Sequence, residues 1–152
     1  MKRILRPFLL AVLLLIGLNT PAQIGITSYN FSTLAINTSQ NRMISGELKT
    51  FLNYYSQGIK VEVDLFYNFK AREYHRFSVG VGINGYPFEE GDIIHALTVP
   101  LQLEVYPIQD FKRISILYEF TPQIEFEDDF SILHLFGIRY SFGEGLSNEE
   151  NN

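Results

Sequence analysis

The sequence predicts an all-β protein: an eight-stranded antiparallel up-and-down β-barrel of the transmembrane, outer-membrane type. Apolar and polar residues alternate at a period of two along most of the chain, and short turns join the alternating segments. Such short connections favour antiparallel neighbours, because parallel strands need a long crossover. No stretch after residue 22 approaches a run of about 18 apolar residues, so we expect any membrane crossing to use a closed barrel.

The first residues are typical of a secretory signal peptide. Bases at positions 2, 3 and 6 precede an apolar run, Phe8–Leu18, and a small-residue cleavage site that ends at Ala22. We expect cleavage after Ala22, a barrel domain over residues 23–143 and a disordered polar tail, Glu144–Asn152. With no cysteine in the sequence, we expect neither a lipoprotein anchor nor a disulfide framework.

The charge of the exported part argues against nucleic-acid binding. All 17 acids but only 9 of the 12 bases follow residue 22, which gives this part a formal charge of −8. Nucleic-acid binding depends on basic side chains that neutralise phosphates. We therefore expect one exported domain with no nucleic-acid partner.

The strand segments can be taken in order along the chain. Ile24–Thr38 is either one long strand or a short hairpin of Ile24–Asn30 and Ser32–Thr38. The later predicted strands are Arg42–Leu52, Ile59–Phe69, Arg76–Tyr86, His95–Tyr106, Arg113–Glu125 and Phe130–Phe142. Pro100 lies within one of them and costs a ladder hydrogen bond unless a bulge accommodates it.

The direction of the last strand fixes the expected topology. If it runs down to the periplasm, an N-terminus on the same side requires an even number of strands, hence eight, and the first region must supply two. These two are shorter than the roughly 9–11 residues that a crossing needs. The expected periplasmic turns are Lys70–His75 and Ile108–Lys112, and the expected outward turns are Asn53–Gln57, Glu89–Asp92 and Glu127–Asp129.

Charged residues on the polar face decide which side of the wall faces inward. Alternation alone also fits a soluble barrel, whose apolar face would surround a ligand. The polar face carries five acids and four bases in mid-strand: Glu47, Lys49, Lys60, Glu62, Asp64, Arg76, Glu104, Glu119 and Arg139. Eight strands enclose a space that side chains fill, and so nearly balanced a set can pair there. We therefore predict a lumen ion-pair network, no open pore and an apolar face turned to lipid.

Aromatic residues support the membrane interpretation. Ten of them lie at or near predicted strand ends: Tyr54, Tyr55, Tyr67, Phe69, Tyr86, Phe88, Tyr106, Phe111, Phe126 and Phe130. Membrane barrels carry such girdles at both interfaces. Strand propensity alone explains why aromatics are enriched, but it does not explain their placement at strand ends.

Three features together resemble the small outer-membrane β-barrel proteins of the Bacteroidota. They are the signal ending in Pro-Ala-Gln, the segment Val99–Pro107, and the closing Gly137-Ile-Arg-Tyr-Ser-Phe142. The chain departs from the pattern in continuing for ten residues beyond Phe142, since the aromatic is often the last residue. Such a protein would be a monomer in contact with outer-membrane lipid and lipopolysaccharide, inserted by the barrel assembly machinery.

No motif predicts catalytic, cofactor-binding or metal-binding residues. Gly80–Gly85 has the glycine spacing of a dinucleotide site, but Tyr86-Pro87-Phe88 follows it where that motif needs a helix. His75, His95 and His134 fall on different segments without metal-ligand spacing.

Two acidic rims fall on the expected outward side. They comprise Glu89, Glu90 and Asp92, and Glu125, Glu127, Asp128 and Asp129. They would either bind Ca²⁺ or Mg²⁺ that bridges lipopolysaccharide or be solvated loops, and we expect solvated loops.

The expected role is non-enzymatic: stabilising the envelope or presenting loops to a partner. The alternatives are a membrane-embedded lipid-modifying hydrolase, which needs a histidine and a serine together on the lipid face, and a soluble periplasmic ligand-binding barrel. Pore formation is a weaker idea.

Overall fold

A computed structural model describes residues 24–30, 32–38, 42–52, 59–88, 94–108, 111–126 and 130–142 of the chain. The predicted signal peptide and polar tail lie outside these residues, as do all three predicted outward turns. Within the described part, no helix is long and apolar enough to cross a membrane.

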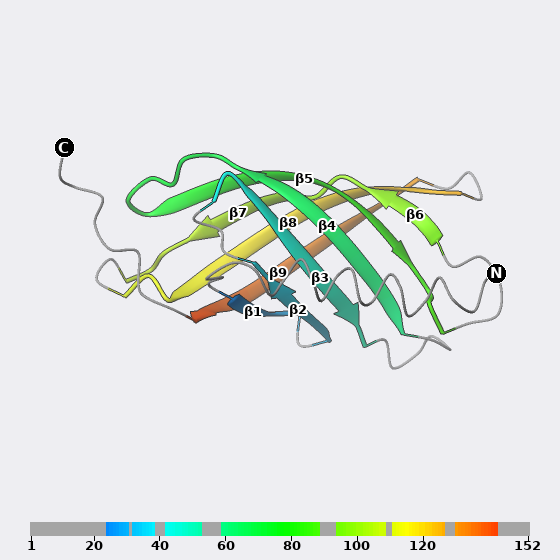
Figure 1. Cartoon of the computed structure of the whole chain (residues 1–152), viewed down its shortest axis with the longest axis horizontal. Helices are drawn as coiled ribbons and strands as arrows, with labels where there is room; N and C mark the ends of the chain where they lie inside the picture. Colours follow the sequence, from blue (N-terminus) through cyan, green and yellow to red (C-terminus); the bar gives the residue numbers. More distant parts are fainter. Residues whose placement is uncertain are drawn as a thin grey trace.

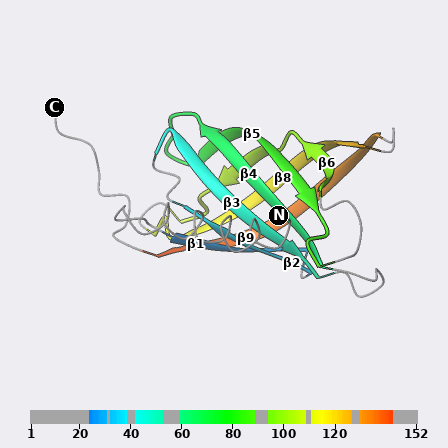
Figure 2. The same cartoon turned by 45° about the vertical axis from the view of Figure 1, so that its right-hand side comes forward.

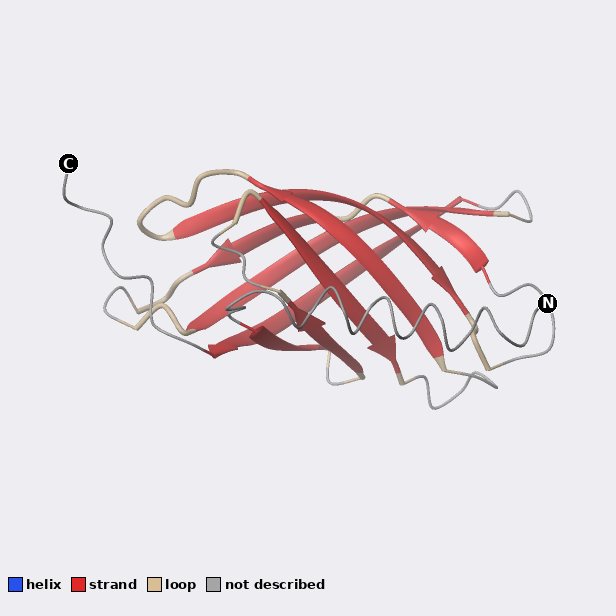
Figure 3. Cartoon of the chain, in the orientation of Figure 1, coloured by secondary structure: helices blue, strands red, loops and turns tan. Residues whose placement is uncertain are grey.

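The described part of the chain is all-β, as predicted (Figures 1 and 3). Alternating apolar and polar residues place one set of side chains on each face of every strand. The strands are β1 (Ile24–Tyr29), β2 (Thr33–Asn37), β3 (Ile44–Phe51), β4 (Lys60–Asn68), β5 (His75–Gly85), β6 (Ile94–Thr98), β7 (Leu101–Val105), β8 (Ile114–Glu125) and β9 (Phe130–Phe142).

The strands close into an antiparallel barrel. Consecutive strands pair from β1 to β5, β8 pairs with β9, and β1 pairs with β9 from Ile24↔Phe142 to Tyr29↔Gly137. Both β6 and β7 lie between β5 and β8, so nine strands occupy eight positions around the barrel. In both views β3 and β4 cross in front of β8 and β9, as opposite walls of a barrel do (Figure 2). The predicted closed barrel is confirmed.

The structure corrects the prediction of one unbroken strand over His95–Tyr106. The strand is interrupted at Val99–Pro100, because proline has no N–H to donate. The register nevertheless continues across the interruption, since Thr98 pairs with Gly82 and Leu101 with Val79. Two backbone bonds hold the break: Val99 N–H donates to the Pro122 carbonyl over 3.0 Å, and the Pro100 carbonyl accepts from Gly80 N–H over 2.7 Å.

The ambiguous first region is a hairpin. Asn30 turns the chain with φ 44°, a left-handed conformation that asparagine tolerates better than most residues. Its side chain continues the β1–β9 ladder: Oδ1 accepts from Phe136 N–H over 3.0 Å, and Nδ2 donates to the His134 carbonyl over 3.2 Å. Within the described residues, β9 from Phe130 to Phe136 pairs along its length only with β8.

The two faces of the wall differ sharply in burial. On β4, Glu62 and Asp64 are buried inside while Val63 and Leu65 are exposed outside. On β9, Arg139 is fully buried between the exposed Ile138 and Tyr140. Charged and polar residues therefore dominate the interior, beside a small apolar cluster that comprises Tyr29, Ala35, Phe51, Leu117 and Leu135.

Candidate functional site

The candidate site is the charged interior of the barrel, built from alternate residues of facing strands. On β3, Glu47 and Lys49 point inward. The antiparallel register sets Glu47 beside Asp64 of β4, and Lys49 beside Glu62. Lys49 and Glu62 are opposite charges directly across two strands and attract, whereas Glu47 and Asp64 are like charges that need cations from elsewhere in the lumen.

Lys49 is the first of two buried cations around which the ion pairs of the interior are arranged. Its Nζ lies 2.9 Å from Glu62 Oε1, 2.9 Å from Asp64 Oδ2 and 2.5 Å from Glu119 Oε1. Glu119 belongs to β8, which does not neighbour β3, so this ion pair crosses the lumen. The Thr121 hydroxyl donates to the same Glu119 oxygen over 2.8 Å.

Arg139 is the second centre. Its Nη2 lies 2.6 Å from Glu47 Oε2, and its Nη1 lies 3.6 Å from Glu104 Oε2. Its Nε donates to the Thr27 hydroxyl over 2.9 Å. Because these partners lie on β3, β7 and β1, one guanidinium connects three strands of the wall.

Two uncharged residues join the centres. The Tyr29 hydroxyl donates to Glu47 Oε1 over 2.9 Å, and Gln102 Nε2 donates to the Tyr29 hydroxyl over 2.9 Å. Gln102 Nε2 also lies 3.1 Å from Glu119 Oε2. The two cations therefore belong to one network, and its members reach across the middle of the barrel.

The third base of the lumen, Arg76, lies nearer the barrel end that carries the start of β1 and the end of β9. Arg76 Nη2 lies 3.2 Å from Glu104 Oε2 and contacts the Tyr106 hydroxyl. The Ser115 hydroxyl donates to Glu104 Oε1 over 2.5 Å. Glu104 therefore lies within ion-pair distance of both Arg76 and Arg139.

Eight of the nine predicted network residues lie together inside the barrel, and Lys60 lies apart. Lys60 is half-buried at the first residue of β4, where Nζ donates to Gln123 Oε1 over 3.2 Å and lies 5.5 Å from the centre of the Phe51 ring. It forms no ion pair with any described residue. The network proper thus has five acids and three bases, a formal charge of −2.

The uncharged members of the network were missed from the sequence. Thr27 and Tyr29 are inward-facing positions of β1, and their alternation with exposed Ile26 and Ser28 could have found them. The Tyr29 ring also needs room: a Cβ on Gly137, its partner across the ladder, would lie 2.6 Å from Tyr29 Cδ1.

The glycines of Gly80–Gly85 have a packing role. A Cβ on Gly80 would lie 2.9 Å from both the Phe66 ring and the Pro100 side chain. A Cβ on Gly82 would overlap the Asp64 carboxylate. These glycines therefore leave space for bulky or charged neighbours on the inner face.

The three histidines lie apart and have no serine partner among the described residues. His134 Nδ1 lies 2.8 Å from the Tyr118 hydroxyl on the outer face. The His134 ring packs edge-on against Phe120, and the Tyr118 ring contacts Phe136. His95 lies 3.4 Å from Glu125, and His75 is exposed at the start of β5.

No described group of three His, Cys, Asp or Glu residues is arranged to hold a metal ion. Six of the seven residues in the predicted acidic rims lie outside the described ranges. The seventh, Glu125, accepts from the Ser131 hydroxyl over 3.0 Å.

Comparisons with known proteins returned no match: no family model, no curated protein and no solved structure is similar to the chain. The interior between the described strands is filled by paired polar and charged side chains. Its large side chains, among them Arg139, Lys49 and Tyr29, are fully buried and bonded to one another across the lumen. Such a network holds the walls at fixed separation and fills the space through which a solute would pass.

Proposed function

We propose that the protein is a small outer-membrane β-barrel with a side-chain-filled interior, which has a structural or loop-presenting role in the cell envelope. One observation carries the proposal: large apolar side chains cover the outside of the wall while ion pairs fill the inside. Leu65 on β4, Val81 on β5, Ile116 on β8 and Ile138 on β9 are each at least half exposed on the outer face.

This distribution is unfavourable in water. Soluble monomers rarely expose contiguous apolar patches larger than a few hundred Å², and here apolar residues recur on the outer face of every strand. In a bilayer the same side chains contact hydrocarbon, while the closed ladder satisfies the backbone groups. The soluble ligand-binding barrel needs the opposite orientation, with apolar side chains around a central cavity.

Strand lengths and aromatic placement add support. The long strands β5, β8 and β9 have 11, 12 and 13 residues, enough for tilted strands to cross a hydrocarbon core. Exposed aromatic rings flank them, with Phe111 before β8 and Phe126 after it. Aromatic rings at the two ends of a membrane-crossing strand would lie at the two membrane–water interfaces.

The filled interior favours a non-enzymatic, non-conducting role. The protein would be exported after cleavage following Ala22, inserted by the barrel assembly machinery and monomeric among outer-membrane lipid and lipopolysaccharide. Its outward loops would meet partners while the network keeps the barrel rigid beneath them.

Fractionation tests this proposal. We expect the full chain to pellet with outer membranes, to require detergent for extraction, and to migrate faster on a gel when unheated than when boiled. Release by osmotic shock without detergent would contradict the membrane location. A planar bilayer that conducts steadily with the purified protein would contradict the filled interior.

A further inference from the structure

The barrel end that carries the start of β1 and the end of β9 gathers five of the six described bases that lie outside the lumen network. Five bases lie in its turns: Arg42, Lys70, Arg72, Lys112 and Arg113. The only acid described in these turns is Glu73.

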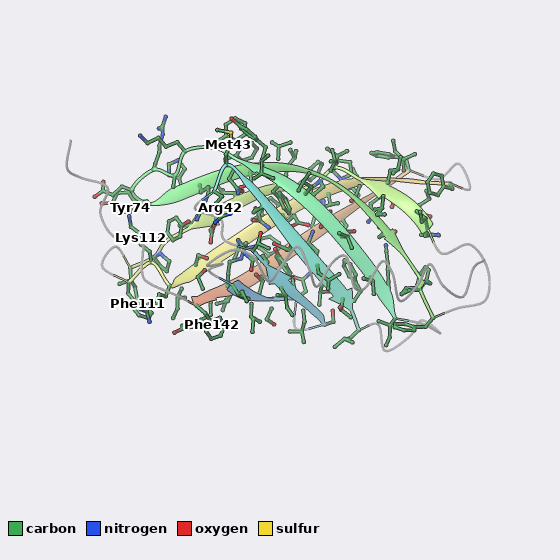
Figure 4. The ribbon with its side chains drawn as sticks, viewed as in Figure 1. Arg42, Met43, Tyr74, Phe111, Lys112 and Phe142 are labelled. Carbon is green, nitrogen blue, oxygen red and sulfur yellow. The ribbon has the colours of Figure 1, made fainter. Side chains whose placement is uncertain are left out.

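Exposed apolar side chains lie at the same end as these bases. Met43, Tyr74, Phe111 and Phe142 are 64%, 52%, 39% and 48% exposed. Figure 4 shows all four, with Arg42 and Lys112, gathered at one end of the barrel although they come from four separate segments. We name the five bases and these four apolar residues the basic rim.

Hydrogen bonds to backbone carbonyls hold the turns of the basic rim in place. Tyr106 N–H donates to the Tyr74 carbonyl over 2.8 Å, which ties the β7–β8 turn to the β4–β5 turn. Ser141 N–H donates to the Arg113 carbonyl over 2.9 Å, and Asn68 Nδ2 donates to the Arg42 carbonyl over 2.9 Å. The bases are therefore brought together by the fold.

The bases of the basic rim differ from those of the lumen in their contacts within the described residues. None of the five forms an ion pair there, in contrast to the three bases of the lumen, each of which has at least one carboxylate partner. Like charges held on neighbouring turns repel one another, and an external anion lowers that repulsion.

We propose that the basic rim binds the phosphates of anionic phospholipids in the leaflet around this end. The inference rests on the proposed membrane location. A lipid fits better than a soluble polyanion because apolar and basic side chains alternate around the rim. Long basic side chains reach the headgroups while neighbouring apolar groups enter the acyl region. Charged headgroups attract juxtamembrane bases in this way.

Native mass spectrometry of the full mature chain tests the proposal. The chain would be refolded in detergent micelles that contain equal amounts of phosphatidylglycerol and phosphatidylcholine. We expect retained lipid to be mainly phosphatidylglycerol. We expect the variant R72Q/R113Q to lose that preference by about 25-fold, since each of the two bases near a charged membrane surface contributes about fivefold.

The matched control is R72K/R113K, which keeps both charges at the same positions and should keep the preference. Equal retention of the two lipids by the folded wild type would overturn the proposal, as would an unchanged preference in R72Q/R113Q.

Gel migration with and without heating, on the same samples, separates this proposal from the broader one. A chain that fails to fold with either lipid contradicts the membrane barrel itself. A folded chain without lipid preference contradicts only the binding of phospholipid phosphate by the basic rim.

Discussion

The inner and outer faces of the barrel wall share one backbone, but their side chains are stabilised in different ways. On β4, Glu62 and Asp64 each have a named partner at hydrogen-bond distance, whereas Val63 and Leu65 point away from the barrel and are exposed. Inside, stability depends on each charge keeping its particular partner, because an unpaired buried charge is costly. Outside, if the proposed membrane location holds, we expect stability to depend only on the class of side chain, because hydrocarbon forms no specific hydrogen bonds or ion pairs.

The largest expected effect comes from breaking the inner face at its most connected residue. Lys49→Met leaves Glu62, Asp64 and Glu119 buried without their shared cation, and removing one partner of a buried ion pair costs about 3–5 kcal/mol. We expect that loss in urea unfolding followed by gel migration. Lys60→Met is the control: it removes one part-buried hydrogen bond, to Gln123 Oε1, and no ion pair with a described residue, so it should lose only about 1 kcal/mol. Equal losses in both variants would contradict the network.

The next effect breaks the outer face. Val81→Arg places a charge on the proposed lipid-facing side of β5, which costs about 2–4 kcal/mol near the middle of a bilayer. The measurement is unfolding from phospholipid vesicles. Ile108→Arg, in a turn of the same protein, should change stability by less than about 1 kcal/mol. If Val81→Arg is as mild as Ile108→Arg, the outer face does not meet hydrocarbon.

A smaller effect compares two glycines on opposite faces. A Cβ on Gly82 would lie 2.6 Å from Thr98 Oγ1 and 2.8 Å from the Val63 carbonyl oxygen, whereas the nearest atom to a Cβ on Gly46 is 3.8 Å away. Gly82→Ala should therefore destabilise by about 1–3 kcal/mol, as overpacking does, while Gly46→Ala stays near wild type. Thermal unfolding in detergent would measure both, and a reversed order would show that the inner face has spare volume.

The smallest effect concerns the polar pair on the outer face. Tyr118→Phe removes the hydroxyl that lies 2.8 Å from His134 Nδ1, at a cost of about 1 kcal/mol. Tyr140→Phe, whose hydroxyl has no hydrogen bond to a described residue, should be neutral. Urea midpoints in vesicles would compare them, and equal midpoints would mean that water already satisfies His134.

Periodicity was sufficient to predict the wall but not the contacts across the lumen. A period of two told which side chains share a face, so the charged set was found on its own face. Which charges meet depends on strand register and on closure of the ring. Arg139 and Glu47, for example, are 92 positions apart and meet only because β9 closes onto β1. Knowing the strand register would also have shown that Lys60 is the first residue of β4 and lies away from the other charged residues of the lumen.

Neutral residues were the other omission. Tyr29 and Gln102 carry no charge to mark them, yet they join the Lys49 and Arg139 centres. Their role follows from a need to saturate the many acceptors of five carboxylates, which three cations alone do not meet. The interruption at Pro100 was foreseen as a lost hydrogen bond, and the unchanged register on both sides required the structure.

The β1–β9 pairing has a kinetic consequence. It forms a seam of six residue pairs between the two ends of the barrel, with Ile24 beside Phe142. Joining residues so distant in sequence carries a large loop-closure entropy, repaid only when the intervening strands are already in register. We therefore expect the β1–β9 pairing to form last. A chain cut short before Gly137 would lack this pairing, and its strands would form an open sheet.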